Sequence, residues 1–246
     1  MFDYDFHIHT ELCGHAPGQT VKTIIEKTKE LGLKMIAVTE HVFGPSDLKK
    51  LDIIRQEIRK HDSSCQVVIG AEVDVDRTVF DGRLTIEHRH DIDYILGTIH
   101  YLPGTEIMPH CEKLRPLGEK ETFERWRSTL LGLVANPLVD TLAHPGAMIA
   151  NAMPGDDFSN AVLDTFAQAA GISAKTGMAW ELNNLTGWKL TPAQKEQYHT
   201  KGGISLTPVH TIGSICDHGR LPANIDGIGK AVFIGRGLSG IFGSSS

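Results

Sequence analysis

The segment YDFHIHT, residues 4–10, joins a short apolar run to two histidines at its carboxyl end. A similar arrangement, in which an apolar run stops at polar residues, recurs along the chain. The further runs are LKMIAVTEH (33–41), CQVVIGAEVDV (65–75), DIDYILGTIHY (91–101), VDTLAHPG (139–146), GMAWELNN (177–184) and GGISLTPVH (202–210). Apolar runs of this length, bounded by turn residues, are typical of buried strands.

Amphipathic stretches lie between most of these runs and predict helices. The expected helices cover residues 20–31, 46–60, 119–132, 157–170 and 191–201. Thr20 and Ser46 are expected to cap the first two helices at their amino ends, and Gly32 to end the first. Strands that alternate with helices predict an α/β fold with a parallel sheet, here from seven strand-helix units.

Composition sets limits on the fold and on the partners. The 246 residues are 41% hydrophobic and 22% charged, and because a single α/β barrel occupies about 250 residues, we expect one domain over residues 1–246 with a frayed tail from about residue 240. The net charge of −6 argues against binding to a long nucleic acid or an anionic membrane.

The ends and the cysteines of the chain indicate a location. The amino end lacks the basic and apolar segments of a signal peptide, and no run approaches the length of a membrane span. The four cysteines, Cys13, Cys65, Cys111 and Cys216, are far apart and form no CxxC pair. We expect a cytoplasmic protein without a disulfide framework.

Histidine is the residue whose count is unusual, with 13 among 246 residues. Seven of them are expected at or just past the carboxyl ends of strands: His7, His9, His15, His41, His100, His144 and His210. Glu72, at the end of VVIGAE, joins them. The carboxyl ends of parallel strands meet at one edge of a barrel, so these side chains are expected to lie close together.

The residue types at this edge predict a metal site. Two histidines two positions apart on a strand leave the same face and can bind one cation. The His-x-His pattern alone is weak, because His88-Arg89-His90 repeats it in what we expect to be a solvated loop. Imidazoles with few thiolates suit Zn, Fe or Mn, and Glu72 can bridge two cations through its two oxygens. We therefore expect a multinuclear centre.

Taken together, these motifs resemble the polymerase and histidinol phosphatase (PHP) family of metal-dependent phosphoesterases. The resemblance is carried by DFHIHTELCGHA, AVTEH, GAEVDV, GTIHY, LAHPG, ELNN and SLTPVH, in this order. It implies a distorted, seven-stranded (β/α)7 barrel, similar to a TIM barrel, with the metal site at the carboxyl-terminal rim of the strands. It also implies a free-standing small phosphatase.

The resemblance further implies a ligand set for three cations. The first would be bound by His7, His9 and Glu72, the second by Glu72, His100 and His144, and the third by His15, His41 and His210. One position departs from the family pattern, because Pro208 stands where the family carries an aspartate two residues before its last histidine. The first cation therefore lacks a charged ligand. Either a water or a neighbouring residue fills the gap, or the site is weaker, or only two of the three divalent ions (Zn, Mn or Fe) bind.

Other polar residues of these motifs have open roles. Asp74 and Asp76 form a solvated face or contact a metal. Glu181 and Asn183 lie on one face of their strand by period two. Asn183 is a candidate for a hydrogen bond to substrate or to a bound water, and Glu181 either replaces part of the missing aspartate or has a buried structural role.

The chemistry implied is hydrolysis of a small phosphomonoester by a metal-activated hydroxide. Glu72, Asn183 and His210 are the candidate catalytic residues. Candidate phosphate-binding residues are the loop arginines Arg77, Arg83 and Arg115, since arginine binds phosphate in a bidentate manner. Histidinol phosphate is favoured weakly over a nucleotide as the substrate.

Two alternatives remain open from the sequence. An amidohydrolase-type enzyme also uses His-x-His after its first strand, but it normally bridges its metals with a modified lysine, where this chain has Glu72. A degenerate, non-catalytic metal-binding domain would be consistent with Pro208. The sequence leaves the oligomeric state undetermined.

Overall fold

The computed structural model describes residues 4–14, 16–106, 115–145, 149, 159–181 and 206–207 of the chain. Within these residues, seven parallel strands form one sheet in chain order. They are β1 (Tyr4–Ile8), β2 (Met35–Val42), β3 (Gln66–Asp74), β4 (Tyr94–Thr98), β5 (Thr141–Leu142), β6 (Ala179–Glu181) and β7 (Leu206–Thr207). The predicted α/β fold with a parallel sheet is confirmed.

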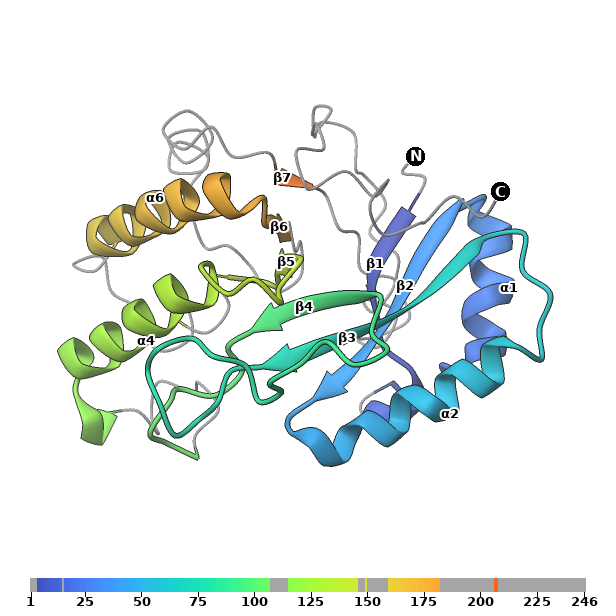
Figure 1. Cartoon of the computed structure of the whole chain (residues 1–246), viewed down its shortest axis with the longest axis horizontal. Helices are drawn as coiled ribbons and strands as arrows, with labels where there is room; N and C mark the ends of the chain where they lie inside the picture. The colour runs from blue at the N-terminus through green and yellow to red at the C-terminus, as the bar shows by residue number, and fades with distance from the viewer. Residues whose placement is uncertain are drawn as a thin grey trace.

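Figure 1 shows the sheet with α1 and α2 beside β1, β2 and β3, whereas α4 and α6 lie next to each other beyond β4, β5 and β6. The pairs that the described residues form leave β1 and β7 at the two ends of the strand order. Closure of the sheet into a barrel therefore stays a prediction. No helix within the described ranges is both long and apolar enough to cross a membrane.

The first two helices follow β1 and β2. Helix α1 (Val21–Leu31) begins after Thr20, whose side chain accepts a hydrogen bond from the Thr23 N–H, and ends at Gly32 with a left-handed φ of 67°, as predicted. Helix α2 (Leu48–Ile58) differs from the prediction, because Ser46 does not cap it. Ser46 lies inside a 3-10 turn, η2 (Pro45–Asp47), and the Asp47 carboxylate accepts the Phe43 N–H instead.

The second pair of helices is longer than predicted. Helix α4 (Glu119–Leu133) follows a 3-10 turn, η3 (Arg115–Leu117), and α6 (Ser159–Thr176) extends six residues past its predicted end. The connection from β3 to β4 contains no helix. Within it, Val75 and Leu84 form an isolated antiparallel β-bridge. Regular strand-helix alternation is therefore broken at this connection. The helix predicted at residues 191–201 lies outside the described residues.

Three buried aromatic side chains join α4 and α6 to β6. Trp126 of α4, Phe166 of α6 and Trp180 of β6 are almost fully buried, and the ring centroids of Phe166 lie 5.5 Å from Trp126 and 5.9 Å from Trp180. The Trp180 indole N–H also donates to Ser173 Oγ of α6 at 2.7 Å. Edge-to-face aromatic packing of this kind fixes both helices against β6.

Candidate metal centre

Strand β1 positions the first two histidines. His7 is the fourth residue of β1 and His9 follows its end, so both side chains leave one face while Ile8 packs into the core. Both imidazoles are buried, and their Nε2 atoms lie 3.0 Å apart. Two ring nitrogens directed at the same point form the kind of donor pair that binds a cation.

Glu72 lies at the centre of the site. Its carboxylate is fully buried near the end of β3, and the register places it directly opposite His41 of β2. Five imidazole nitrogens lie within 3.4 Å of its two oxygens. The nitrogens near Oε2 are His7 Nε2 (3.4 Å), His9 Nε2 (3.3 Å) and His41 Nδ1 (2.9 Å), and those near Oε1 are His100 Nε2 (3.3 Å) and His144 Nε2 (2.7 Å).

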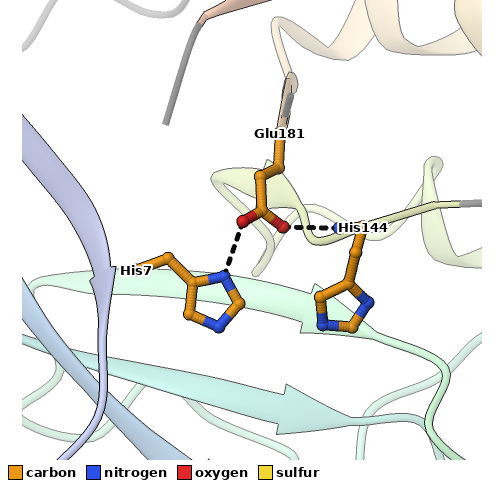
Figure 2. Close-up of side chains that lie close together, drawn as sticks. All are labelled: His7, His144 and Glu181. Carbon is orange, nitrogen blue, oxygen red and sulfur yellow. Dashed lines mark hydrogen bonds and ion pairs between the residues drawn. The ribbon is translucent and has the colours of Figure 1, made fainter. Parts of the chain in front are cut away.

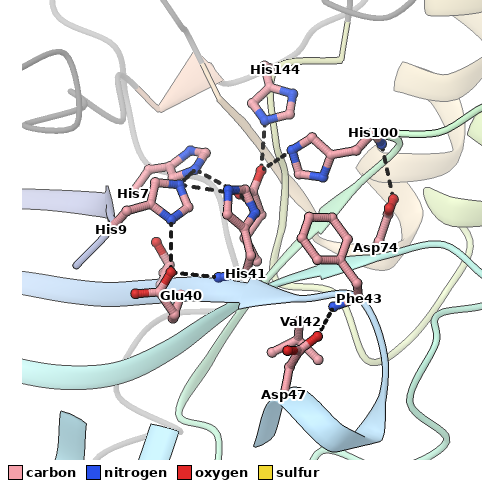
Figure 3. Close-up of polar contacts among 12 residues, drawn as sticks. His7, His9, Glu40, His41, Val42, Phe43, Asp47, Asp74, His100 and His144 are labelled. Atoms are coloured by element: carbon pink, nitrogen blue, oxygen red, sulfur yellow. Dashed lines mark hydrogen bonds and ion pairs between the residues drawn. The ribbon is translucent and has the colours of Figure 1, made fainter. Parts of the chain in front are cut away.

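These five histidines lie at the ends of four strands, β1, β2, β4 and β5, with both His7 and His9 at the end of β1. Figure 3 shows His7, His9, His41, His100 and His144 gathered together at one edge of the sheet. His100 follows β4 and His144 follows β5, so residues as far apart in sequence as positions 7 and 144 meet here. The structure therefore brings together six of the eight predicted metal ligands, whereas His15 and His210 lie outside the described residues.

Burial and charge act in opposite directions on Glu72. Burial raises the pKa of its carboxyl, but His100, His7 and His41 lower it more, and the net pKa lies well below the usual range. Burial likewise lowers the pKa of His7, yet Glu181 and Glu72 raise it well above the ordinary value. Glu72 is therefore an ionised carboxylate in a pocket of imidazoles, which compensate its charge.

The remaining imidazoles divide into two groups. The pKa of His9 and His100 is raised because carboxylates, Glu40 and Glu72 for His9 and chiefly Glu72 for His100, outweigh burial. His41 differs, because burial lowers its pKa to about 4 despite the attraction of Glu72. At neutral pH, His41 is thus an uncharged imidazole, whereas the raised pKa of His9 and His100 means that protons compete with a metal for these two rings.

The donor set fits divalent cations. Within the described residues, three groups bring three donor atoms within 4.8 Å of one another: His7, His9 and Glu72; His41, Glu72 and His100; and His7, His144 and Glu181. Glu72 Oε2 is buried and has no hydrogen-bond partner of good geometry in the described structure, although three imidazole nitrogens are near it. Nitrogen and carboxylate donors without thiolate suit Zn, Mn or Fe.

Two further carboxylates lie near the Nδ1 atoms of His7 and His9, on the opposite side of each ring from Nε2. Glu181, at the end of β6, lies 2.8 Å from His7 Nδ1. Glu40 of β2 lies 3.8 Å from His9 Nδ1, and it accepts hydrogen bonds from the Thr10 backbone and hydroxyl. Sequence reasoning assigned no role to Glu40. Its position directly before His41 at a strand end could have indicated a role, because an acid buried there requires polar partners.

Asp74 and Asp76 have different surroundings. The expectation of a solvated face is wrong for Asp74, whose side chain is fully buried. Its Oδ1 accepts the His100 N–H at 3.0 Å, and burial raises its pKa to about 6. Asp76 is half-buried and binds Thr78. Asp74 thus fixes the backbone of His100, and it is absent from the three candidate metal groups.

Among the predicted arginines, Arg77 is next to the site. Its guanidinium carbon lies 3.5 Å from the ring centroid of Tyr101 and 5.7 Å from that of Phe43, and Phe43 stacks on His41 at 5.2 Å. Sequence reasoning gave neither aromatic residue a role, although Tyr101 directly follows His100 and Phe43 lies two residues after His41. The Arg77 guanidinium is therefore held on an aromatic surface that borders the histidines.

The other predicted substrate residues are not placed at the site. Arg83 is exposed, and its guanidinium forms a salt bridge with Asp81. Arg115 begins η3, but its side chain lies outside what the structure describes. Asn183, Pro208 and His210 also lie outside the described residues.

Comparison with known proteins gives one family and several relatives. Residues 5–185 match the family described as "PHP domain". A protein of Clostridium acetobutylicum named "Probable histidinol-phosphatase" is 28% identical over 148 residues, which are 57% of this chain and 56% of that protein. A "Probable phosphatase" of Acetivibrio thermocellus is 25% identical over 155 residues, covering 59% of this chain and 55% of the relative. The chain thus spans little more than half the length of either relative.

A solved structure shares the fold. It is the histidinol phosphate phosphatase of Lactococcus lactis in complex with zinc, L-histidinol and phosphate. It superposes with a TM-score of 0.57 and 16% identity, over 85% of this chain and 86% of that one. At this identity, the likeness supports the fold of the described sheet and helices.

Proposed function

Because the chain belongs to the PHP domain family, we propose that it is a metal-dependent phosphatase that hydrolyses a small phosphomonoester. The observation that carries this proposal is the convergence of five buried imidazoles on one buried carboxylate, Glu72. Such a donor set, without a thiolate and without a nucleophilic serine or cysteine among its members, fits cations that act directly on a phosphoester.

The residues that would hold the cations form two groups that share Glu72. His7 and His9 form one with it, and His41 and His100 form the other. His144, 2.7 Å from Glu72 Oε1, completes the described set, and His15 and His210 are proposed ligands of a third cation. When bound, divalent metals lower the pKa of water to produce a nucleophile and offset charge on the phosphoryl oxygens. We propose two or three ions of Zn, Mn or Fe.

This proposal places the centre at the carboxyl-terminal rim of a seven-stranded barrel in a single domain over residues 1–246. The support is that β1 to β6 end next to the site residues and that each strand pairs with the next in parallel. In a barrel of this kind, the loops after the strands enclose the substrate. A cytoplasmic location and the absence of a membrane or long nucleic-acid partner remain part of the proposal.

Arg77 is the arginine that the geometry favours for the substrate phosphate. Tyr101 and Phe43 hold its guanidinium next to His41, while its ionic partner Glu106 is exposed, 3.4 Å away. An exposed salt bridge is worth little, so a phosphate can replace Glu106 as the partner. Arg115 and Arg83 are weaker proposals for the same role, and Glu72, Asn183 and His210 are the proposed catalytic residues.

Histidinol phosphate is the substrate that we propose first. The support comes from the named relative in C. acetobutylicum. Nucleotides and other small phosphoesters are the next candidates. The site contacts that would separate these substrates include the aromatic surface of Phe43 and Tyr101.

The test combines elemental analysis of the purified protein with a screen of phosphomonoesters that includes histidinol phosphate and nucleotides. We expect bound divalent metal and hydrolysis of at least one small phosphomonoester. The matched control is His88→Ala, which removes an exposed imidazole and should change neither result. Protein saturated with Zn, Mn or Fe but inert on the whole panel would instead indicate a degenerate domain. Activity on amides or lactones alone would indicate an amidohydrolase.

A further inference from the structure

Glu181 uses both of its carboxylate oxygens on the histidines of the site. Oε1 lies 2.8 Å from His7 Nδ1, and Oε2 accepts the backbone N–H of His144 at 2.6 Å (Figure 2). The carboxylate is fully buried. A buried carboxylate with both oxygens occupied in this way is an acceptor that fixes its two partners.

The contact with His7 sets which ring nitrogen carries hydrogen. An ionised carboxylate only accepts hydrogen bonds, so His7 Nδ1 must be the donor. The lone pair of the neutral ring is then on Nε2, which faces His9 Nε2 at 3.0 Å and Glu72 at 3.4 Å. Metal-binding histidines are typically oriented by a carboxylate on the opposite nitrogen in this way.

The contact with His144 holds an unusual backbone. His144 has a φ of 24°, one of only two positive φ values among the described residues other than glycine. Such a conformation is costly for a residue with a side chain and persists where its surroundings fix it. The bond from its N–H to Glu181 fixes the backbone, while its ring reaches Glu72 at 2.7 Å.

Glu181 is itself held rigidly from the helix side. The preceding residue, Trp180, points to the opposite face of β6, where it packs on Phe166 and donates to Ser173. Backbone pairing of Trp180 with Leu142 fixes β6 against β5, two residues before His144. The packing of Trp180 on α6 therefore fixes the position of Glu181, and Glu181 in turn fixes His7 and His144.

We propose that Glu181 is a positioning residue that orients His7 and His144 for metal binding, and that it does not replace the aspartate missing at Pro208. This inference rests on the proposed metal centre. Its second part is carried by the two contacts: each oxygen of Glu181 already accepts a hydrogen bond from a histidine, so a cation bound there would have to share an oxygen with one of these hydrogen bonds.

The test measures zinc affinity and stoichiometry by competition with a chromophoric chelator for the wild type, Glu181→Gln and Asp140→Asn. A Gln side chain has one acceptor oxygen and cannot serve both histidines, so we expect zinc affinity to fall about 10- to 100-fold with the number of bound ions unchanged. Asp140 accepts the Ile95 N–H and binds Arg89 without contacting an imidazole, so Asp140→Asn should keep the wild-type affinity. Loss of one bound ion in Glu181→Gln would show that Glu181 is a ligand and would overturn the proposal.

A second measurement needs no variant. Long-range ¹H–¹⁵N NMR of the zinc-loaded wild type should show His7 with hydrogen on Nδ1 and zinc on Nε2, and the opposite assignment would overturn the proposal even if Glu181→Gln fails to fold. The outcomes are separable from those of the proposed function. Unchanged zinc affinity in Glu181→Gln, with wild-type hydrolysis intact, contradicts only the positioning role, whereas a wild type that binds zinc but hydrolyses no phosphoester contradicts only the phosphatase. A wild type that binds no zinc contradicts both.

Discussion

His7-Ile8-His9 and His88-Arg89-His90 have the same spacing of imidazoles but opposite surroundings. In the first, both rings are buried and the Nε2 atoms are 3.0 Å apart. In the second, both histidines are exposed, their ring centroids are 6.3 Å apart, and His90 has a positive φ of 50°. An extended strand directs alternate side chains to one face, whereas the backbone at His90 does not.

The middle residues also differ. Ile8 is fully buried and belongs to the main core, so it anchors the first motif. Arg89 instead bonds to the carbonyls of Ile92 and Leu138 and to the Asp140 carboxylate, which ties the loop to the sheet. His7 and His9 thus form a donor pair because the strand directs both rings toward an acidic partner, Glu72, which His88 and His90 do not contact in the described structure.

Removing that acidic partner should produce the largest effect. Glu72→Ala deletes the carboxylate that all five imidazoles approach, and His100→Ala deletes one of the imidazoles. Each should reduce bound metal and phosphoester hydrolysis by orders of magnitude, as seen by elemental analysis and turnover. Unchanged turnover in either variant would contradict the assignment of these residues to the metal centre.

One alanine substitution in each motif tests directly whether the two motifs differ in zinc binding. His7→Ala should weaken zinc binding by more than about 100-fold, because loss of a ligand exceeds loss of a supporting contact. His88→Ala should leave zinc affinity at the wild-type value, because its ring is exposed and lies outside the candidate metal groups. Competition with a chelator measures the zinc affinity of both variants. Equal losses of affinity would mean that the position of the first motif on β1 does not distinguish it from the second.

The pH should affect zinc binding through the buried imidazoles of the site. The pKa values of His7, His9 and His100 are raised, so protons compete with the metal and are released on binding. Zinc affinity should therefore fall as the pH decreases through these raised values, while His41, with a pKa of about 4, contributes little to this fall near neutrality. Calorimetry in buffers of different ionisation enthalpy counts the protons, and a pH-independent affinity would contradict the raised pKa values.

The smallest expected effect concerns stability alone. Arg89→Ala removes hydrogen bonds that join the second motif to Asp140 and Leu138, and it should lower the free energy of unfolding by about 1–3 kcal/mol. Zinc affinity should stay unchanged, because Arg89 does not contact a site histidine in the described structure. Urea unfolding measures the first quantity, and a parallel loss of zinc binding would mean that this loop supports the site.

Much of the fold was predictable because periodicity is local. The range 4–8 of β1, the cap at Thr20 and the stop at Gly32 follow from side-chain alternation and from the φ preference of glycine. The start of α2 was not, because Asp47 bonds to Phe43 and Pro45 begins a separate turn. Competing hydrogen bonds of this kind are not visible in hydrophobic spacing.

The candidate site was predictable in part for the same reason. The strand-end rule selects His7, His9, His41, Glu72, His100 and His144, which the structure places together, and the family resemblance is confirmed. It also selected Asp74, whose burial was not foreseen, and overlooked Glu40. Both acids act through backbone or imidazole contacts made across strands, and the sequence does not state which strands are neighbours in space.

The sequence by itself determined the donor types, their strand-end positions and the family, because these depend on residue identity and on period-two alternation. Only the tertiary structure decided how the donors are shared. It assigned both oxygens of Glu181 to His7 and His144 and placed Arg77 on Tyr101. The physical reason is distance: such contacts require residues far apart in the chain to approach within about 3 Å, and the packing of helices and sheet sets that approach.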